Sequence, residues 1–203
     1  MDSDNQVELK LDELVASGDY ESVIFTNLKI GDIIPKSDIS AYLIDNVTLP
    51  DRLKNHTPGT VPLTQIANKF SGGIGQIWDL FERHGTRKGD ITIIPYTKVF
   101  EEGIGQCAEK GILTQLCAQT GRKSYYLNGY ICIPEDGIEL PEPHGFNIII
   151  KENVPHLIDV SNPLFDENGG SKPCIIPISD INEDGEIILA SKLKDNRTYF
   201  LRL

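Results

Sequence analysis

Three residues that together can activate a thiol occur in order along this chain: Cys107, His144 and Asp159. A Gly-rich approach precedes the cysteine, and an apolar run typical of a helix follows it. A thiol at a helix N-terminus lies at the positive end of the helix dipole, which favours the reactive thiolate. A histidine that holds the proton and an aspartate that orients the histidine would complete a nucleophile suited to acyl transfer.

The predicted strands place His144 and Asp159 close together. His144 begins a strand over residues 144–151, and Asp159 lies near the end of a strand over 154–160, with a link short enough for a hairpin. In such a hairpin the two residues lie about two positions from direct opposition, within diagonal reach on one face. Because side chains alternate between faces, His156 points away from Asp159. The sequence therefore predicts His144, rather than His156, as the base.

Each of these residues also has an ordinary structural interpretation. Cys107 could be a small buried apolar side chain, and His144 could simply begin a strand. Asp159 could initiate the turn that follows it. Asn162 is an alternative orienting group, although its type favours turn formation. A zinc site made of Cys107, His144, His156 and Asp159 matches no common ligand spacing, so no metal is predicted.

Short motifs surround the three residues and cover about residues 100–163. They are Gly105-Gln106-Cys107-Ala108-Glu109, Gly121, Gly129-Tyr130, His144-Gly145-Phe146 and Leu157-Ile158-Asp159-Val160. Together they resemble the transglutaminase-like cysteine-enzyme superfamily, which has a papain-like fold and a Cys-His-Asp triad. The resemblance implies that Cys107 is the nucleophile, His144 the base and Asp159 the orienting residue.

The chain departs from that family at two places. Phe146 stands where a tryptophan is frequent near the histidine, and the arginine usual after the catalytic helix is absent, with Ser124 and Tyr125 in that region. Both departures concern the surroundings of the triad. They leave the substrate class open.

The resemblance implies acyl transfer through a thioester, without a cofactor. The leading expectation is a hydrolase, either a protease or a deamidase, that acts on peptide or glutamine side-chain amides of a protein or peptide substrate. Beside the backbone N–H of Cys107, the Trp78 indole and the Gln106 amide are candidate oxyanion donors. Three alternatives remain: a non-catalytic protein-binding module of the same fold, an amine-accepting transglutaminase or arylamine N-acetyltransferase-like transferase, and an effector-type deamidase.

Composition narrows the partners and the compartment. The net charge of −11 over 203 residues disfavours nucleic acid and anionic membrane surfaces as partners. No apolar run approaches the roughly 20 residues that a membrane helix needs. The acidic N-terminus is unlike a signal peptide, so a cytoplasmic protein is expected, with a secreted effector as the alternative.

The four cysteines form no Cys-x-x-Cys pair and are expected to be free thiols. Oligomeric state is not indicated.

The elements that must position these residues follow from periodicity. Apolar residues at helical spacing predict a helix over 74–84, and a second helix is expected from Cys107 to Thr120, before Gly121. Strands are predicted over 123–133, 144–151, 154–160, 173–178, 185–190 and 197–203. Helices followed by strands indicate an α+β fold in which the catalytic helix packs on an antiparallel β-sheet.

The N-terminal segment is expected to be partly helical. Residues 1–70 are assigned to a segment of mixed helix and loop, either separate from the core or integral to it, and 71–203 to the catalytic core. Within the first segment, Asp38 is predicted to cap a short helix that holds Ala41, Leu43 and Ile44. Residues 46–62 and 134–143 are expected to be loops.

Overall fold

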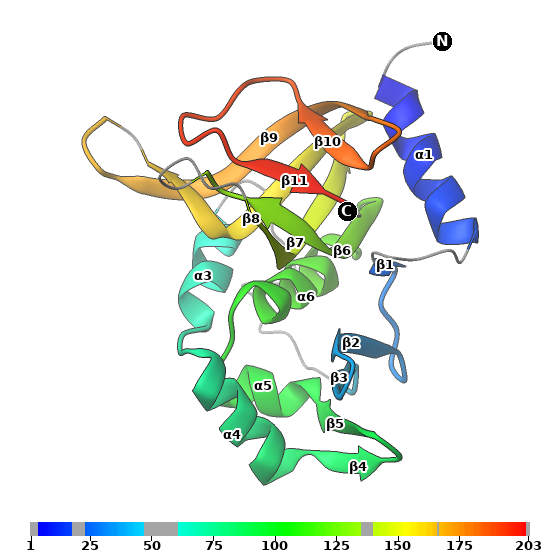
Figure 1. Cartoon of the computed structure of the whole chain (residues 1–203), viewed down its shortest axis with the longest axis vertical. Coiled ribbons are helices and arrows are strands. Elements are labelled where there is room, and N and C mark those ends of the chain that lie inside the picture. The colour runs from blue at the N-terminus through cyan, green and yellow to red at the C-terminus, as the bar shows by residue number, and fades with distance from the viewer. Residues whose placement is uncertain (1–3, 18–22, 47–60, 135–139, 166, 202–203) are drawn as a thin grey trace.

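A closed six-stranded antiparallel barrel dominates the computed structural model (Figure 1). The structure describes residues 4–17, 23–46, 61–134, 140–165 and 167–201. The strand order around the barrel is β6-β11-β10-β9-β8-β7, and pairing of β7 with β6 closes it. The strands are β6 (Ser124–Cys132), β7 (Pro141–Lys151), β8 (Val154–Phe165), β9 (Ser171–Ile181), β10 (Glu186–Leu189) and β11 (Thr198–Phe200). A short strand, β1 (Val23–Thr26), adds to β6 antiparallel.

Alternation along β6 separates the interior of the barrel from its outer wall. Tyr125 and Leu127 are fully buried among the apolar residues inside the barrel. Tyr126, between them, is equally buried but belongs to a second apolar cluster outside the wall. This period of two is the property of a strand that is covered on both faces. The barrel wall therefore has a second layer packed against it.

The second layer begins with α6 (Cys107–Ala118), which contacts β6, β7 and β8. Figure 1 shows α6 between the barrel and a smaller four-stranded sheet of order β2-β3-β5-β4. These strands are β2 (Ile33–Ser37), β3 (Ser40–Leu43), β4 (Thr86–Lys88) and β5 (Ile91–Pro95). The accompanying helices are α3 (Val61–Lys69), α4 (Ile74–His84) and α5 (Tyr96–Glu102). None of the helices within the described residues combines the length and the apolar character needed to span a bilayer.

Residues near the N-terminus contribute to both apolar clusters. The helix α1 (Asp4–Ser17) contacts β8 and β9, and its Val7 and Leu11 are fully buried in the cluster inside the barrel. On β2 and β3, Ile34 and Tyr42 join the cluster that surrounds α6. Residues 4–17 and 23–46 thus share their packing with the rest of the described chain.

The two helices predicted from periodicity are confirmed. The helix α4 has the predicted bounds, and Ile77 and Phe81 are buried, whereas Ile74 and Trp78 are exposed. The helix α6 begins at Cys107 as expected and ends at Ala118, two residues before the predicted end. Strands are present in all six segments predicted after Gly121, and the antiparallel sheet that they form closes into a barrel.

The prediction of a short helix after Asp38 is wrong. Ser40–Leu43 forms β3, which pairs antiparallel with β2 and parallel with β5. The pairing satisfies the backbone on both sides and buries Ala41 and Tyr42, which outweighs the weak local preference of this stretch. The predicted loops fall largely outside the described residues, at 47–60 and 135–139; Val61 and Pro62 instead begin α3, and β7 begins at Pro141.

Candidate active site

The first residue of α6 is Cys107, whose side chain is half-buried. The residues before it approach α6 beside Ser71, whose carbonyl accepts the N–H of Gly105 at 3.0 Å. Gln106 is the N-cap of the helix and has an exposed side chain. This arrangement leaves the backbone N–H groups of the first helical turn free of partners within the helix. Cys107 thus lies where a helix favours negative charge.

His144 faces the thiol from β7 and is only 5% exposed. Its ring hydrogen-bonds with the side chain of Cys107, and the backbone N–H of Gly145 donates to the same sulfur. Burial alone would raise the pKa of the thiol, but the bond and charge of His144 and the Gly145 donor outweigh it, so the pKa is lowered. Burial would lower the pKa of His144, but Asp159 and Cys107 raise it to about 10. Each of the two groups therefore favours the charged form of the other.

Asp159 lies on β8 and is completely buried, and both oxygens of its carboxylate accept hydrogen bonds. Its Oδ2 atom accepts from His144 Nε2 at 2.9 Å, from Asn162 Nδ2 at 3.1 Å and from the Tyr199 hydroxyl at 2.9 Å. Its Oδ1 atom accepts the backbone N–H groups of Ser161 and Asn162 at 2.9 and 3.1 Å. Burial opposes ionisation of this group, but these donors and the charge of His144 lower its pKa. Asp159 is thus a fixed anion.

The bond to Asp159 also assigns the tautomer of His144. A carboxylate only accepts, so Nε2 carries the proton that it donates to Asp159. The other ring nitrogen, Nδ1, is the one left to exchange a proton with the sulfur of Cys107. The order of contacts is sulfur, Nδ1, Nε2 and carboxylate, as a nucleophile with a base and an orienting acid requires.

Two aromatic rings hold the imidazole in place. Phe146 stacks on His144 with ring centroids 6.2 Å apart and 19° between planes, and Tyr199 lies against the same ring at 6.3 Å. Phe146 and Tyr199 also meet edge to face at 5.4 Å. Phe146 thus packs against the histidine at the position where the resembling family often has tryptophan.

Gly145 brings β7 unusually close to α6. A Cβ atom at this position would lie 2.9 Å from the Cα atom of Ala108 and 3.1 Å from the hydroxyl of Tyr126. No real side chain tolerates such contacts without a shift of the backbone around it. The absence of a side chain at residue 145 is therefore what lets the histidine strand reach the cysteine helix.

The structure brings Cys107, His144 and Asp159 together and leaves His156 apart, as side-chain parity predicts. His156 Nδ1 lies 2.9 Å from the carbonyl of Val154 on its own strand. The other cysteines are buried, and burial raises the pKa of both Cys117 and Cys174 to about 12. Within the described residues, no group of three ligating side chains could hold a metal ion.

The two predicted side-chain oxyanion donors remain candidates. Gln106 adjoins the thiol in sequence, and its amide is exposed. Trp78 is 36% exposed on α4, where its ring contacts Phe81 at 5.9 Å. The turn before α4 lies beside the approach to Cys107, because Ser71 bridges Ile104.

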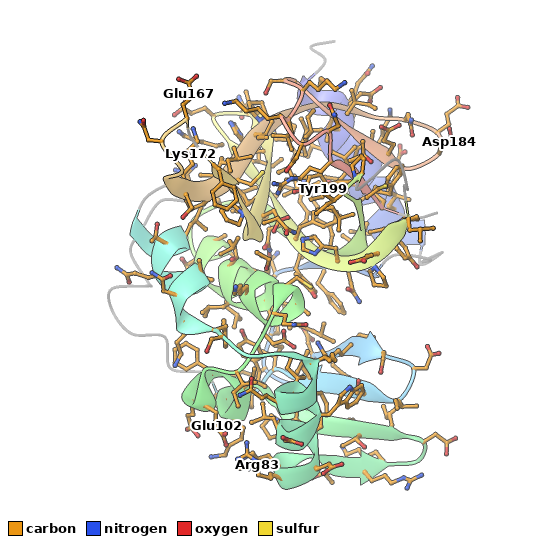
Figure 2. All side chains as sticks on the ribbon, turned by 60° about the vertical axis from the view of Figure 1, so that its left-hand side comes forward. Arg83, Glu102, Glu167, Lys172, Asp184 and Tyr199 are labelled. Carbon is orange, nitrogen blue, oxygen red and sulfur yellow. The ribbon has the colours of Figure 1, made fainter. Side chains whose placement is uncertain are left out.

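Sequence reasoning missed part of the support for Asp159. Tyr199 comes from β11, 40 residues further along the chain, and Figure 2 shows it on the barrel. Asn162, which the sequence offers as an alternative orienting group, instead joins the aspartate: its Nδ2 lies 3.2 Å from His144 Nε2 and 3.1 Å from Asp159 Oδ2. No local pattern signals Tyr199, because barrel closure alone brings it there.

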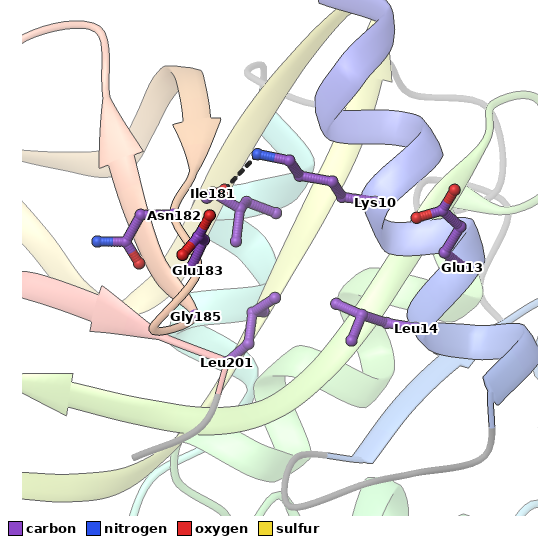
Figure 3. Close-up of a pocket in the computed structure, with 8 residues that line it drawn as sticks. All are labelled: Lys10, Glu13, Leu14, Ile181, Asn182, Glu183, Gly185 and Leu201. Atoms are coloured by element: carbon purple, nitrogen blue, oxygen red, sulfur yellow. Dashed lines mark hydrogen bonds between the residues drawn. The ribbon is translucent and has the colours of Figure 1, made fainter.

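A separate pocket lies away from these residues (Figure 3). It has a volume of about 350 Å³ between α1 and the turn from β9 to β10. Leu14, Ile181 and Leu201 line it, and the Lys10 ammonium donates to the carbonyl of Ile181 across it at 2.6 Å. Cys107, His144 and Asp159 are not among its lining residues.

Comparisons with known proteins add nothing to the geometry observed around Cys107. Comparison of the chain with protein-family models gives no match. Searches of curated proteins and of solved structures likewise give none.

Proposed function

We propose that this chain is a cysteine acyl-transfer enzyme of transglutaminase-like fold, and specifically a hydrolase of peptide or glutamine side-chain amides. One observation carries the proposal: the thiol of Cys107, the imidazole of His144 and the carboxylate of Asp159 are in contact in that order. Each group is held by neighbours that favour its reactive ionisation state. Perturbed pKa values combined with a nucleophile–base–acid geometry are typical of catalytic sites.

The reaction begins when the thiolate of Cys107 attacks the carbonyl carbon of the amide. The new C–S bond forms while the carbonyl π electrons move onto oxygen. Collapse of this intermediate breaks the C–N bond, and the leaving amine takes the proton from the His144 imidazolium. Asp159 keeps the ring oriented and stabilises its charged form throughout.

The second half regenerates the thiol. Water enters, His144 removes one of its protons, and the hydroxide attacks the thioester carbonyl. The C–S bond then breaks and its electron pair returns to sulfur, while the acid product leaves. Attack by an amine in place of water would make the same site a transferase.

The oxyanion needs hydrogen-bond donors at the start of α6. The backbone N–H of Cys107 belongs to the first turn, where helix amides lack partners within the helix. The exposed Gln106 side chain is the nearest candidate in sequence for a second donor. Such donors typically contribute factors of ~10²–10³ in rate.

Protein or peptide substrates fit a site whose thiol is half-buried at the protein surface. All four cysteines are free, which suits a reducing compartment such as the cytoplasm. The net charge of −11 argues against nucleic acid and anionic membranes as partners.

The test is a trapped acyl-enzyme. The native chain and Cys107→Ala are incubated with 4-nitrophenyl acetate, and the intact mass is followed together with nitrophenolate release. We expect one acetyl group on the native chain and none on Cys107→Ala. Ammonia release from a glutamine dipeptide and cleavage of casein then separate deamidase from protease. Acetylation of both proteins at the same rate would contradict the proposal.

A further inference from the structure

A fully buried carboxylate lies two residues after the nucleophile. Glu109 is 0% exposed in the first turn of α6. Its Oε2 atom accepts the backbone N–H of Gln106 at 2.7 Å. Its Oε1 atom accepts from the Lys36 ammonium at 2.8 Å and from the hydroxyl of Tyr42. One side chain thus joins the turn before Cys107 to two strands of the small sheet.

The turn before the nucleophile is built closely around this side chain. A Cβ atom on Gly105 would lie 2.6 Å from the Cβ of Glu109, so the backbone of Gly105 rests on its stem. The hydroxyl of Tyr96 donates to the Glu109 carbonyl at 2.6 Å and fixes the helix end from another direction. The backbone of Gln106 has φ −124° and ψ −140°, a conformation outside the regular elements. The hydrogen bond from its N–H to Glu109 holds that conformation.

Stability alone does not explain a buried ion pair at this place. Taking Glu109 and most of Lys36 out of water has a large desolvation cost, and well-packed apolar residues are often as stable. A buried ion pair is best justified where a fixed geometry is needed. Here the geometry that it fixes is the backbone of Gln106 and Cys107.

We propose that Glu109, held by Lys36 and Tyr42, is a positioning residue that orients the turn at Gln106 and Cys107 so that the Cys107 N–H faces the developing oxyanion. The inference rests on the proposed acyl transfer. It assigns the small sheet a part in the reaction, because Lys36 and Tyr42 belong to β2 and β3.

Two reactions of the same thiol separate this role from a general structural one. Alkylation by iodoacetamide needs the thiolate but creates no oxyanion, because the sulfur displaces iodide from a saturated carbon. Acylation by 4-nitrophenyl acetate needs the thiolate and also places negative charge on the carbonyl oxygen. Misplaced oxyanion donors therefore slow acylation and spare alkylation.

Glu109→Gln should show this separation. An amide has one oxygen, which can satisfy either the Gln106 N–H or the Lys36 ammonium, and the charged donor should win. The NH₂ group then faces the Gln106 N–H, two donors meet, and the turn is released. Because the charge of Glu109 raises the pKa of the Cys107 thiol, its loss should not slow alkylation. We expect acylation to fall ~10–100-fold while alkylation stays the same or becomes faster. Glu101→Gln, which removes an exposed carboxylate paired with Lys98, is the matched control and should leave both rates unchanged.

A second substitution should restore the turn. In Lys36→Met/Glu109→Gln no ammonium competes for the amide oxygen, which can return to the Gln106 N–H, while its NH₂ group donates to the Tyr42 hydroxyl. We expect most of the lost acylation rate to return. Should Glu109→Gln not fold, as judged by near-UV circular dichroism, Glu109→Asp replaces it, because the shorter side chain keeps its charge for Lys36 but withdraws from Gln106.

The outcomes distinguish the two proposals. If the native chain forms no acetyl adduct at Cys107, the proposed function fails and this inference falls with it. If the native chain is acylated and the folded Glu109 variant is acylated as fast, only the positioning role is overturned. A parallel loss of both reactions, or a double variant as slow as the single one, overturns it as well.

Discussion

At the thiol of Cys107, burial and the imidazolium of His144 act in opposite directions on ionisation. The lowered pKa means that thiolate predominates above it and disappears as the pH falls through it. In His144→Ala the burial remains but the cation is gone, so the pKa should return to its ordinary value of about 8.5 or above. We expect iodoacetamide alkylation at pH 7 to slow at least ~10-fold, with the acid limb of the pH–rate profile moving to higher pH. An unchanged profile would show that His144 does not govern the thiol.

The hydroxyl of Tyr199 is one of five donors to Asp159, and its removal should have a measurable cost. Tyr199→Phe keeps the ring that packs on Phe146 but leaves Oδ2 with two donors. We expect the free energy of unfolding in urea to fall by about 1–2 kcal/mol. Tyr125→Phe is the comparison, since it removes a bond to the partly exposed Asp12, and it should cost less. Equal losses of unfolding free energy in the two variants would mean that the bond from Tyr199 to Asp159 stabilises the protein no more than the bond to Asp12.

Cys107 could be predicted at this scale from its place at a helix start, and the pairing of His144 with Asp159 could be predicted because hairpin geometry and side-chain parity act over short distances. The strands that carry His144 and Asp159 are joined by a two-residue turn, so the proximity of the two side chains follows from strand pairing alone. Tyr199 and Lys36 lie 40 and 73 residues from their partners Asp159 and Glu109. Their roles depend on which distant strands meet, and no spacing in the sequence carries that information.

Among the elements, the contact between α6 and β7 sets the distance from thiol to imidazole. Gly145→Ala would place a Cβ within 2.9 Å of Ala108, so the helix and strand must separate. Overpacking of this kind typically costs about 1–3 kcal/mol. We expect that loss in urea unfolding, together with slower alkylation of Cys107 at pH 7.

The control for Gly145→Ala is another glycine with open space around it. A Cβ on Gly75 in α4 meets nothing within 4 Å, so Gly75→Ala should stabilise the protein by about 0.5–1 kcal/mol through helix propensity. Both variants losing stability alike would show that the close approach at Gly145 is not the cause.

At the same scale, elements with strong local patterns were predictable and the small sheet was not. The helix α4 has both an apolar stripe and flanking glycines, which fix its bounds. The strand β3 is four residues long and pairs parallel with β5, some 50 residues later. Its burial comes from that pairing, so a short apolar run after Asp38 could be read equally well as a helix.

Across the whole molecule, two fully buried carboxylates make stability depend on pH. The pKa values of Glu109 and Asp159 are both lowered by their partners, despite burial. Their contribution to stability is therefore complete above the unfolded-state values of about 4 and is lost as the pH falls through the folded-state values. We expect the urea midpoint to drop between pH 5 and pH 2, and to drop less steeply in Lys36→Met/Glu109→Gln. The same slope in both proteins would exclude Glu109 as a source.

Only one member of the triad is open to the outside, since Asp159 is completely buried and His144 nearly so, while Cys107 is half-buried. Both reactants of the proposed reaction must then reach the sulfur from the same exposed side of Cys107. The amine released in the first half has to depart before water or another amine can enter. An excess of that amine would occupy the access route to the sulfur and convert the thioester back to the amide. Access to the thiol, rather than the chemistry, would then set the order in which product leaves and the second reactant binds.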